Sequence, residues 1–269
     1  MFNAAEFVRP RLSETFRSLP APADIANAIE QTVHRVEALL PAFVHAEAMT
    51  IYLESSGSVV YPDGTIEMTP LSIITGMQSP KNNVIRLGIW EIQNDELALR
   101  SILAHEMGHM LVEWASRQAG TIPADQDLFR NWDASIYEGV AEFISAVTTG
   151  STIIGCDTCW FHRDIFKYQT IDEARQDHLT LEMLEAQMNS NGWAARYPVY
   201  GDFLKFLKDW FQDPTHVDQY AAGDWLAMKL WQASDSGKTP KDIIRRILEV
   251  AQTRVHIDSP EDFLATVLP

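Results

Sequence analysis

Residues 96–118 read ELALRSILAHEMGHMLVEWASRQ, and this stretch decides how the rest of the chain is interpreted. Its apolar residues recur with the period of a helix, and no proline interrupts it before Gly120. The preceding pair, Asn94-Asp95, is of the type that caps a helix N-terminus. The sequence therefore predicts one long helix that carries His105-Glu106-x-x-His109 near its middle.

The spacing of this motif suits a metal ion. Residues four apart are neighbours on one helix face, so His105 and His109 can offer imidazole nitrogens to the same ion. Glu106 lies one residue round from His105, where its carboxylate can reach a water at the metal without binding the metal itself. His-Glu-x-x-His is a zinc pattern in which the glutamate serves as general base. The alternative is an amphipathic helix that happens to carry two histidines.

A third ligand is expected downstream, because a catalytic zinc is held by three protein ligands and keeps an open position. Residues 137–144 read YEGVAEFI and have helical character. Glu138 and Glu142 share one face of this predicted helix, and either carboxylate could bind. Gly139 costs roughly 0.5–1 kcal/mol inside a helix. A close approach of this helix to the His105 helix would explain its presence.

Taken together, the His105 motif and the Glu138-Gly139 helix resemble the gluzincin metallopeptidases, the clan of thermolysin and the alanyl-type aminopeptidases. The resemblance covers residues 95–211. It implies that Glu138 is the third zinc ligand. It also implies that Glu142, one turn on, hydrogen-bonds the far nitrogen of a zinc histidine and so fixes its tautomer and orientation. The implied fold is zincin-like, with a small N-terminal mixed sheet, the active-site helix and a mainly helical C-terminal half.

The resemblance also implies a donor for the oxyanion of a tetrahedral intermediate. In YPVYGDFLKFL, residues 197–207, a tyrosine would donate its hydroxyl to that oxyanion. Tyr197 is the first candidate and Tyr200 is the alternative.

Two further segments bear on substrate binding through the same resemblance. The predicted strand of residues 83–90, just before the zinc helix, would be an edge strand that pairs with an extended substrate. Residues 76–78 read GMQ, at about the distance from His105 where alanyl-type aminopeptidases carry Gly-x-Met-Glu-Asn. In that family, the glutamate of this run binds the free α-amine of the substrate, whereas Gln78 is uncharged. This departure favours an endopeptidase over an aminopeptidase.

The order of the elements predicts an α+β fold. Apolar residues fall at helical spacing from Ser13 to Leu40, and the segment from Met49 to Trp90 contains three to five short strands. After Gly120 almost everything is predicted helical. Asp133 can cap the first of these helices, and Thr239-Pro240 and Ser259-Pro260 are typical helix starts. The expected helices span residues 134–147, 180–189, 198–211, 223–234, 240–252 and 260–267.

Length predicts one large domain or two small lobes for these 269 residues. The N-terminal lobe, 1–118, would contain the sheet and the zinc-motif helix. The helical C-terminal lobe, 119–269, would supply the third ligand, and the two would form one catalytic unit with the cleft between them.

Charge and composition narrow the possible partners and location. The formal net charge is -16, from 37 Asp and Glu against 21 Lys and Arg, whereas nucleic acids and anionic membranes require basic patches. The sequence shows no apolar core of a signal peptide and no apolar run of membrane-spanning length. We therefore expect a cytoplasmic protein that binds neither nucleic acid nor membrane.

The chain has two cysteines, too few for a disulfide framework. Cys156 and Cys159, with His162 nearby, could be half of a second zinc site or a redox pair. Because no further cysteine exists to complete four ligands, a thiol pair or a local disulfide is favoured.

These patterns predict a zinc-dependent peptidase whose partner is a peptide or protein substrate, with its oligomeric state left open. His105, His109 and Glu138 would hold zinc, Glu106 would act as general base, and Tyr197 would steady the oxyanion. The alternative is a zinc-binding regulatory or scaffold protein with a peptidase-like fold and no turnover. The intact Glu106 argues against that alternative, since a scaffold needs ligands but no base. A third hypothesis is a non-peptidase hydrolase with the same zinc chemistry.

Overall fold

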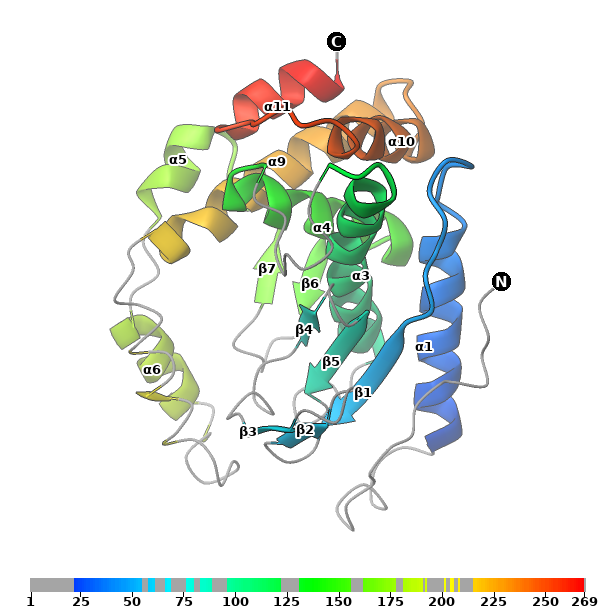
Figure 1. Cartoon of the computed structure of the whole chain (residues 1–269). Helices are drawn as coiled ribbons and strands as arrows, with labels where there is room; N and C mark the ends of the chain where they lie inside the picture. The colour runs from blue at the N-terminus through cyan, green and yellow to red at the C-terminus, as the bar shows by residue number, and fades with distance from the viewer. Residues whose placement is uncertain are drawn as a thin grey trace.

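A long helix, α3 (Glu96–Gln118), lies at the centre of the molecule, with further helices packed around it and small sheets on one side (Figure 1). The computed structural model describes residues 22–54, 58–60, 66–68, 76–79, 83–88, 96–121, 131–155, 162–177, 181–190, 192, 201, 204–205, 208 and 215–268.

In chain order, the elements are α1 (Pro22–Glu37), β1 (Thr50–Glu54), β2 (Ser58–Val60), β3 (Ile66–Met68), β4 (Gly76–Ser79), β5 (Val84–Gly88), α3, α4 (Ala134–Thr149), β6 (Ile153–Gly155), β7 (His162–Asp164), α5 (Ile171–Gln176), α6 (Leu181–Ser190), α9 (Thr215–Asp235), α10 (Pro240–Ala251) and α11 (Pro260–Val267). A helix, then a small sheet, then a mainly helical half is the predicted order. The α+β fold class is therefore confirmed.

The larger sheet has the strand order β1-β5-β4. β1 runs parallel to β5, with Thr50 opposite Val84, and β4 runs antiparallel to β5, with Gly76 opposite Leu87. β5 is thus the central strand, and the prediction that residues 83–90 form an edge strand is wrong. The side chains from Val84 to Leu87 are all buried, as both faces of a central strand require. Among the described strands, the edge nearest to α3 belongs to β4, which packs against that helix.

The antiparallel pair β6 and β7 was not expected in a half of the chain predicted to be helical. Each strand has three residues, which is too short for an alternating pattern to register in the sequence. The turn that leads into β6 begins at Gly150, whose positive φ of 71° ends α4. This hairpin matters for the site because it carries Arg163.

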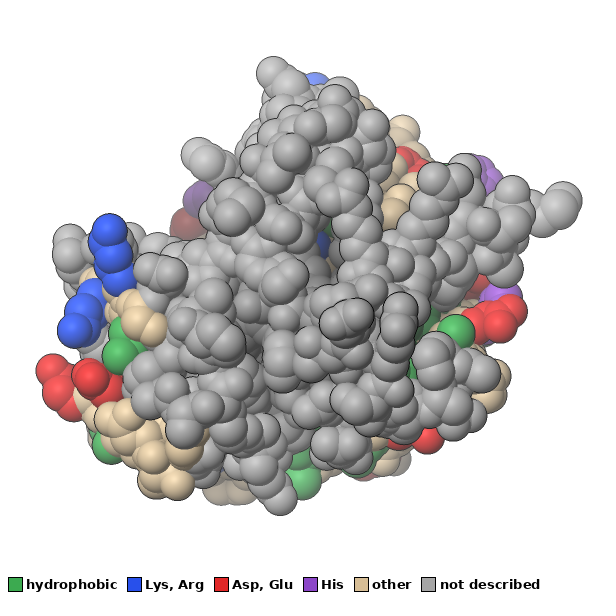
Figure 2. Space-filling view, turned by 90° about the horizontal axis from the view of Figure 1, so that it is seen from below, with side chains coloured by type: hydrophobic (Ala, Val, Ile, Leu, Met, Phe, Trp, Pro, Cys, Tyr) green, Lys and Arg blue, Asp and Glu red, His purple; other side chains and the backbone are tan. Residues whose placement is uncertain are grey.

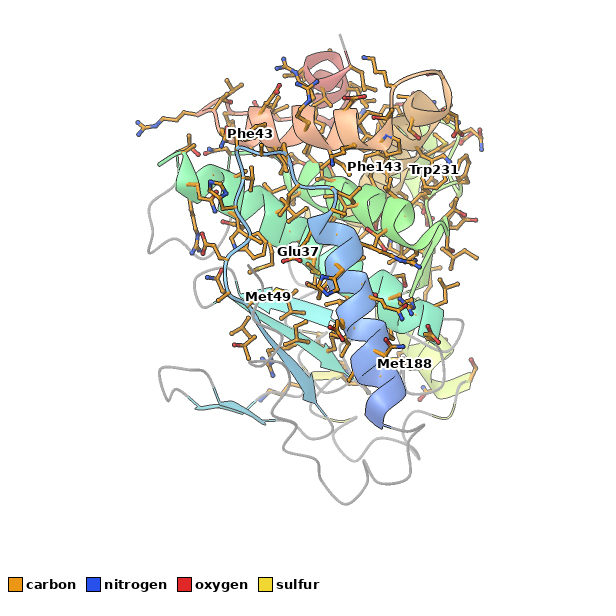
Figure 3. The ribbon with its side chains drawn as sticks, turned by 90° about the vertical axis from the view of Figure 1, so that its right-hand side faces the viewer. Glu37, Phe43, Met49, Phe143, Met188 and Trp231 are labelled. Carbon is orange, nitrogen blue, oxygen red and sulfur yellow. The ribbon has the colours of Figure 1, made fainter. Side chains whose placement is uncertain are left out.

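The central helix α3 is buried all round, since every residue from Ser101 to Ser116 is buried. Such a helix is packed on every side by other elements rather than lying on the surface. α1 covers one side of it (Figure 3), while α4, α10 and β6 pack on others. The core is continuous from Ile29 of α1 to Phe263 of α11, so it includes both predicted lobes. The division at residue 118 stays a prediction.

The helix starts follow the local sequence rules. Asp133 caps α4 by accepting a hydrogen bond from the Ser135 backbone N–H at 2.9 Å. Thr239 and Ser259 cap α10 and α11, each followed by proline at the first helical position, as predicted. α9 begins earlier than predicted, at Thr215. α5 was missed, although the capping box of Thr170 is visible in the sequence.

Two glycines bring helices into backbone contact. A Cβ added to Gly108 would lie 2.7 Å from the Cα of Ala141, so this glycine lets α3 approach α4. A Cβ on Gly139 would lie 2.7 Å from the carbonyl oxygen of Gly223, so Gly139 lets α4 approach α9. The prediction that Gly139 serves the approach to the His105 helix is therefore wrong. Successive residues point about 100° apart round a helix, so the residue after Glu138 faces a different neighbour.

Of the helices that the structure describes, none combines the length and the apolar character that crossing a bilayer requires. Seen from below, acidic side chains are spread around the rim of the molecule (Figure 2). This spread agrees with the net charge of -16.

Candidate metal site

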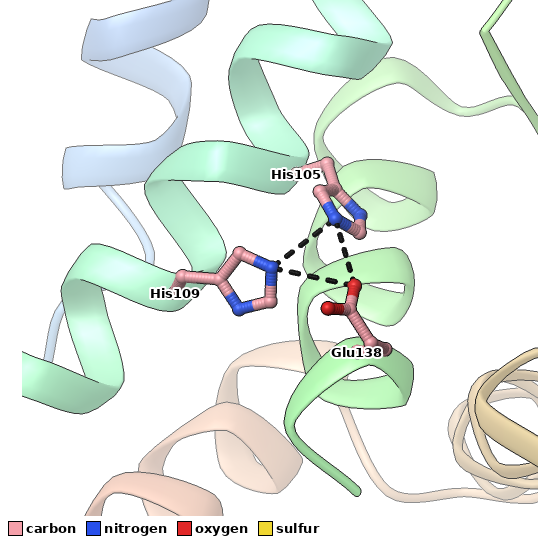
Figure 4. Close-up of side chains that lie close together, drawn as sticks. All are labelled: His105, His109 and Glu138. Atoms are coloured by element: carbon pink, nitrogen blue, oxygen red, sulfur yellow. Dashed lines mark hydrogen bonds and ion pairs between the residues drawn. The ribbon is translucent and has the colours of Figure 1, made fainter. Parts of the chain in front are cut away.

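Three side chains from two helices converge on one point inside the molecule (Figure 4). His105 and His109 lie on adjacent turns of α3, and their Nε2 atoms are 3.2 Å apart. Oε2 of Glu138, from the first turns of α4, lies 3.2 Å from His105 Nε2 and 3.5 Å from His109 Nε2. The structure therefore brings together the three residues that the sequence predicted as metal ligands.

The spacing of these three atoms fits a bound metal ion. Ligand atoms arranged tetrahedrally at about 2.0–2.1 Å from a zinc ion lie about 3.3–3.4 Å from one another. The observed separations of 3.2, 3.2 and 3.5 Å bracket that value. Two imidazoles and one carboxylate also form a donor set that divalent transition metals prefer. This buried group could hold a metal ion.

The side chains of the site are largely buried. His105 and His109 are each 4% exposed, and the Glu138 side chain is 14% exposed. Burial acts to raise the pKa of the Glu138 carboxyl, but His109 and His105 outweigh it and hold that pKa well below its usual value. Glu138 is thus ionised, which is the state in which a carboxylate binds a cation.

Glu106 lies beside this group without belonging to it. Its side chain is buried at the same turn of α3, and burial raises the pKa of its carboxyl to about 7. His105 works against this increase and Glu138 adds to it. A carboxyl whose pKa lies near neutrality is suited both to accept and to donate a proton. Its place therefore agrees with the predicted role of general base.

His109 has a stacked neighbour. The ring of Tyr137, the residue before Glu138, lies 4.1 Å from the His109 ring at an interplanar angle of 27°. The Tyr137 hydroxyl donates a hydrogen bond to Oε1 of Glu113 at 3.3 Å. Burial raises the pKa of Tyr137 well above its usual value, and the Glu113 carboxylate raises it further. The phenol is therefore neutral and remains a hydrogen-bond donor.

Glu142 lies one turn along α4 from Glu138 and faces a buried charge cluster. Nε of Arg163 lies 3.2 Å from its Oε1, and the same guanidinium forms a two-pronged pair with Asp224 of α9, one prong at 3.0 Å. Burial and the neighbouring Asp224 raise the pKa of Glu142 well above its usual value, although Arg163 opposes them. Within the described residues, Arg163 is thus the charged partner that the structure gives to Glu142, in place of the predicted zinc histidine.

Tyr220 of α9 is a residue of the site that sequence reasoning missed. It lies one turn before Gly223, where a Cβ would be 3.3 Å from the Cβ of Glu138. Burial raises the pKa of Tyr220 well above its usual value, and the carboxylates of Glu138 and Glu106 contribute to the increase. The Arg163 guanidinium carbon lies 5.1 Å from the centre of its ring. The Tyr220 phenol is therefore within electrostatic reach of Glu138 and of Glu106, the predicted general base.

Several predicted residues lie outside the part of the chain that the structure describes. They are Tyr197, Tyr200, Cys156 and Cys159, together with the side chains of His162 and Gln78. The roles suggested for them remain predictions.

The fold and the site together define an α+β chain with a buried two-histidine, one-glutamate candidate metal centre. Comparison of the chain with protein-family models, with curated proteins and with solved structures finds no match. The functional argument therefore rests on the residues of this site.

Proposed function

We propose that this protein is a zinc-dependent peptidase with a zincin-like fold, and that it acts as an endopeptidase. The observation that carries the proposal is the convergence of His105, His109 and Glu138 at mutual distances of 3.2 to 3.5 Å, with Glu106 buried beside them. Ligands alone would suit a structural metal, but a buried carboxylate that is placed next to the ligands suits proton transfer.

Zinc is the metal proposed because two imidazoles and one carboxylate are a typical ligand set of catalytic zinc sites. When bound, zinc would act as a Lewis acid towards a carbonyl oxygen and would lower the pKa of a water molecule to about 7. Three protein ligands leave a coordination position open for this chemistry. Within the described residues, no fourth His, Cys, Asp or Glu belongs to the group.

The protein's own side chains supply proton transfer and charge stabilisation. Glu106 accepts the proton of the attacking water and passes it to the nitrogen of the leaving amine. The Tyr220 hydroxyl, whose pKa is raised in part by Glu138 and Glu106, donates a hydrogen bond to the oxygen that becomes negative as the carbonyl is attacked. Tyr197 and Tyr200 are further candidates for this donor.

The arrangement of the sheet supports a peptide as the substrate. β4 is the outermost strand on the side of the described sheet that packs against α3. An extended peptide can add to such a strand through backbone hydrogen bonds, which tolerate many side-chain sequences. This mode of binding holds a peptide by its interior, as an endopeptidase requires.

The proposal is tested by metal analysis and turnover together. We expect about one zinc per chain in the wild-type protein, strongly reduced binding in Glu138→Ala, and cleavage of a quenched fluorescent peptide library by the wild type. Glu106→Gln should keep its zinc and lose turnover, while the matched control Glu182→Gln, at an exposed position of α6, should keep both.

Failure to bind zinc in the wild type, or full turnover in Glu106→Gln, would overturn the proposal. Zinc binding without cleavage of any peptide would support the zinc-binding scaffold instead. Cleavage of a panel of esters but of no peptide would support the non-peptidase hydrolase.

A further inference from the structure

A line of polar side chains runs along one face of the buried helix α3. His105, His109, Glu113 and Arg117 are spaced four residues apart and therefore lie one above another. Glu113 is 0% exposed, although an ionised carboxylate in a protein interior is costly unless it is paired and hydrogen-bonded. Its oxygens lie 3.3 Å from the Tyr137 hydroxyl and 3.9 Å from Nε of Arg117. The hydrogen bond from Tyr137 is therefore one of the contacts that allow this carboxylate to be buried in the core.

Tyr137 connects Glu113 to the ligand group. Its hydroxyl is held by Glu113, which is one turn beyond His109, and its ring lies flat against the His109 imidazole at 4.1 Å. Tyr137 also directly precedes Glu138 in the chain. A ring fixed at both its hydroxyl and its backbone limits the rotation of the imidazole that it covers.

This packing lies against one face of the His109 imidazole. A histidine that binds a metal usually donates its other ring N–H to a carboxylate or a carbonyl, and that bond fixes the orientation of the ring. Nδ1 of His109 is buried and has no hydrogen-bond partner among the residues that the structure describes. On this side of the ring, the stacking contact with Tyr137 takes the place of such a bond.

We propose that Tyr137 and Glu113 form a clamp that positions His109 for metal binding. Glu113 holds the Tyr137 hydroxyl, and the Tyr137 ring holds the imidazole with Nε2 turned towards His105 and Glu138. Both are positioning residues, since they act through the His109 imidazole and neither belongs to the ligand group. This inference rests on the proposed metal site and adds residues to it that the zinc motif does not contain.

The clamp makes a prediction about affinity that differs from a purely structural role. Substitution of residues that orient metal ligands weakens metal binding by about 10- to 100-fold. We expect Tyr137→Phe, which keeps the ring and loses the hydroxyl, to weaken zinc binding about 10-fold, and Tyr137→Leu to weaken it by up to about 100-fold. Glu113→Gln should weaken binding in the wild type and add little in the Tyr137→Phe background, because both changes break the same contact.

The experiment measures the zinc dissociation constant by competition with a chromophoric chelator and the absorption spectrum of the cobalt-substituted protein. Circular dichroism and urea unfolding of the metal-free proteins report on the fold separately. Tyr168→Phe is the matched control, because the Tyr168 hydroxyl also bonds a carboxylate, that of Asp177, outside the ligand group. It should leave zinc affinity and the cobalt spectrum unchanged.

The outcomes separate this inference from the proposed function. Unchanged zinc affinity in folded Tyr137→Phe and Glu113→Gln would overturn the clamp and leave the peptidase proposal intact. An equal loss of affinity in Tyr168→Phe would also overturn it, because the effect would then follow stability alone. If the wild type bound no zinc, both proposals would fail. Tyr137→Phe and Glu113→Gln change few atoms, so the test stands even if Tyr137→Leu does not fold.

Discussion

The contact between α3 and α4 should control metal binding, and Gly108→Ala is the perturbation that tests it. The added Cβ would lie 2.7 Å from the Cα of Ala141, 3.2 Å from its Cβ and 3.3 Å from its carbonyl oxygen. The nearest of these is a backbone atom, so no side-chain rotation can relieve the clash. Reaching an ordinary contact of 3.4 Å requires α3 and α4 to separate locally by 0.7 Å.

The magnitude of the effect follows from that displacement. Ala141 lies one turn from Glu138 on α4, so Glu138 moves away from His105 and His109 with its helix. Metal–ligand distances tolerate deviations of only about 0.2 Å. A shift of the size required should weaken zinc binding by at least about 10-fold. Overpacking costs about 1–3 kcal/mol, whereas alanine in a helix is about 0.5–1 kcal/mol better than glycine. The free energy of unfolding should therefore fall by roughly 1–2 kcal/mol, leaving a folded protein.

Chelator competition and urea unfolding of the metal-free protein measure the two effects independently. Gly201→Ala is the control, because a Cβ there would meet no heavy atom of the described residues within 4 Å. It should keep wild-type zinc affinity and lose no stability, with a gain of up to about 0.5–1 kcal/mol because residue 201 is helical. If Gly108→Ala bound zinc as tightly as the wild type, the link between helix separation and ligand geometry would be refuted.

Three further predictions concern the surroundings of the site. Tyr220→Phe should lower kcat while zinc content stays at the wild-type level, because its hydroxyl is proposed to act on the reacting oxygen; unchanged kcat in a peptide assay would assign that role elsewhere. Glu142 has a pKa raised above its ordinary 4.5, so the folded protein binds a proton that the unfolded chain releases, and stability falls as pH increases. Glu142→Gln removes this loss, so its unfolding free energy relative to wild type should increase between about pH 5 and pH 8 in urea titrations, and a constant difference would contradict the shift. Asp133→Ala removes the N-cap of α4 and should cost about 1 kcal/mol in thermal unfolding, with no effect expected if the cap were unused.

The three candidate ligands could be predicted because the histidine pair is local in sequence and because the family resemblance selected Glu138 over Glu142. The spacing of His105 and His109 on one helix places them on one face, and the Glu138-Gly139 motif marked the second helix. Tyr220 could not be predicted in the same way, since residues 215–222 read THVDQYAA and show no apolar period that would extend the helix upstream. Its place near Glu138 depends on the contact between α9 and α4, which only the folded chain brings about.

The local sequence also does not determine whether a strand lies at the centre or at the edge of its sheet. Residues 84–87 were recognised as a strand, but adjacency to the zinc helix in the chain does not determine which strand lies at the edge. The run Val84-Ile85-Arg86-Leu87 is buried throughout, and such a run is expected of a central strand. In the sequence, the charged residue Arg86 interrupts this apolar run, so the run does not look fully buried.

Glu113 shows how burial changes the meaning of a sequence pattern. Glu113 and Arg117, four residues apart, resemble the ion pairs that commonly lie on solvent-exposed helix faces. In the folded chain, α3 is covered on all sides, so the same spacing places the carboxylate in the core beneath the Tyr137 hydroxyl. There the carboxylate is buried away from water, and the tyrosine and the arginine are among the groups that stabilise it.

The positions of the ligands therefore depend on two kinds of contact. The backbone contacts at Gly108 and Gly139 set the distances between α3, α4 and α9. Because these contacts involve backbone atoms, no side-chain rotation can change them. The Tyr137 ring then fixes one imidazole within that frame. Since the helices and the stacked ring are held by the apolar core and by Glu113, the ligand group can be organised before a metal ion binds, and less of the binding free energy is then required to order it.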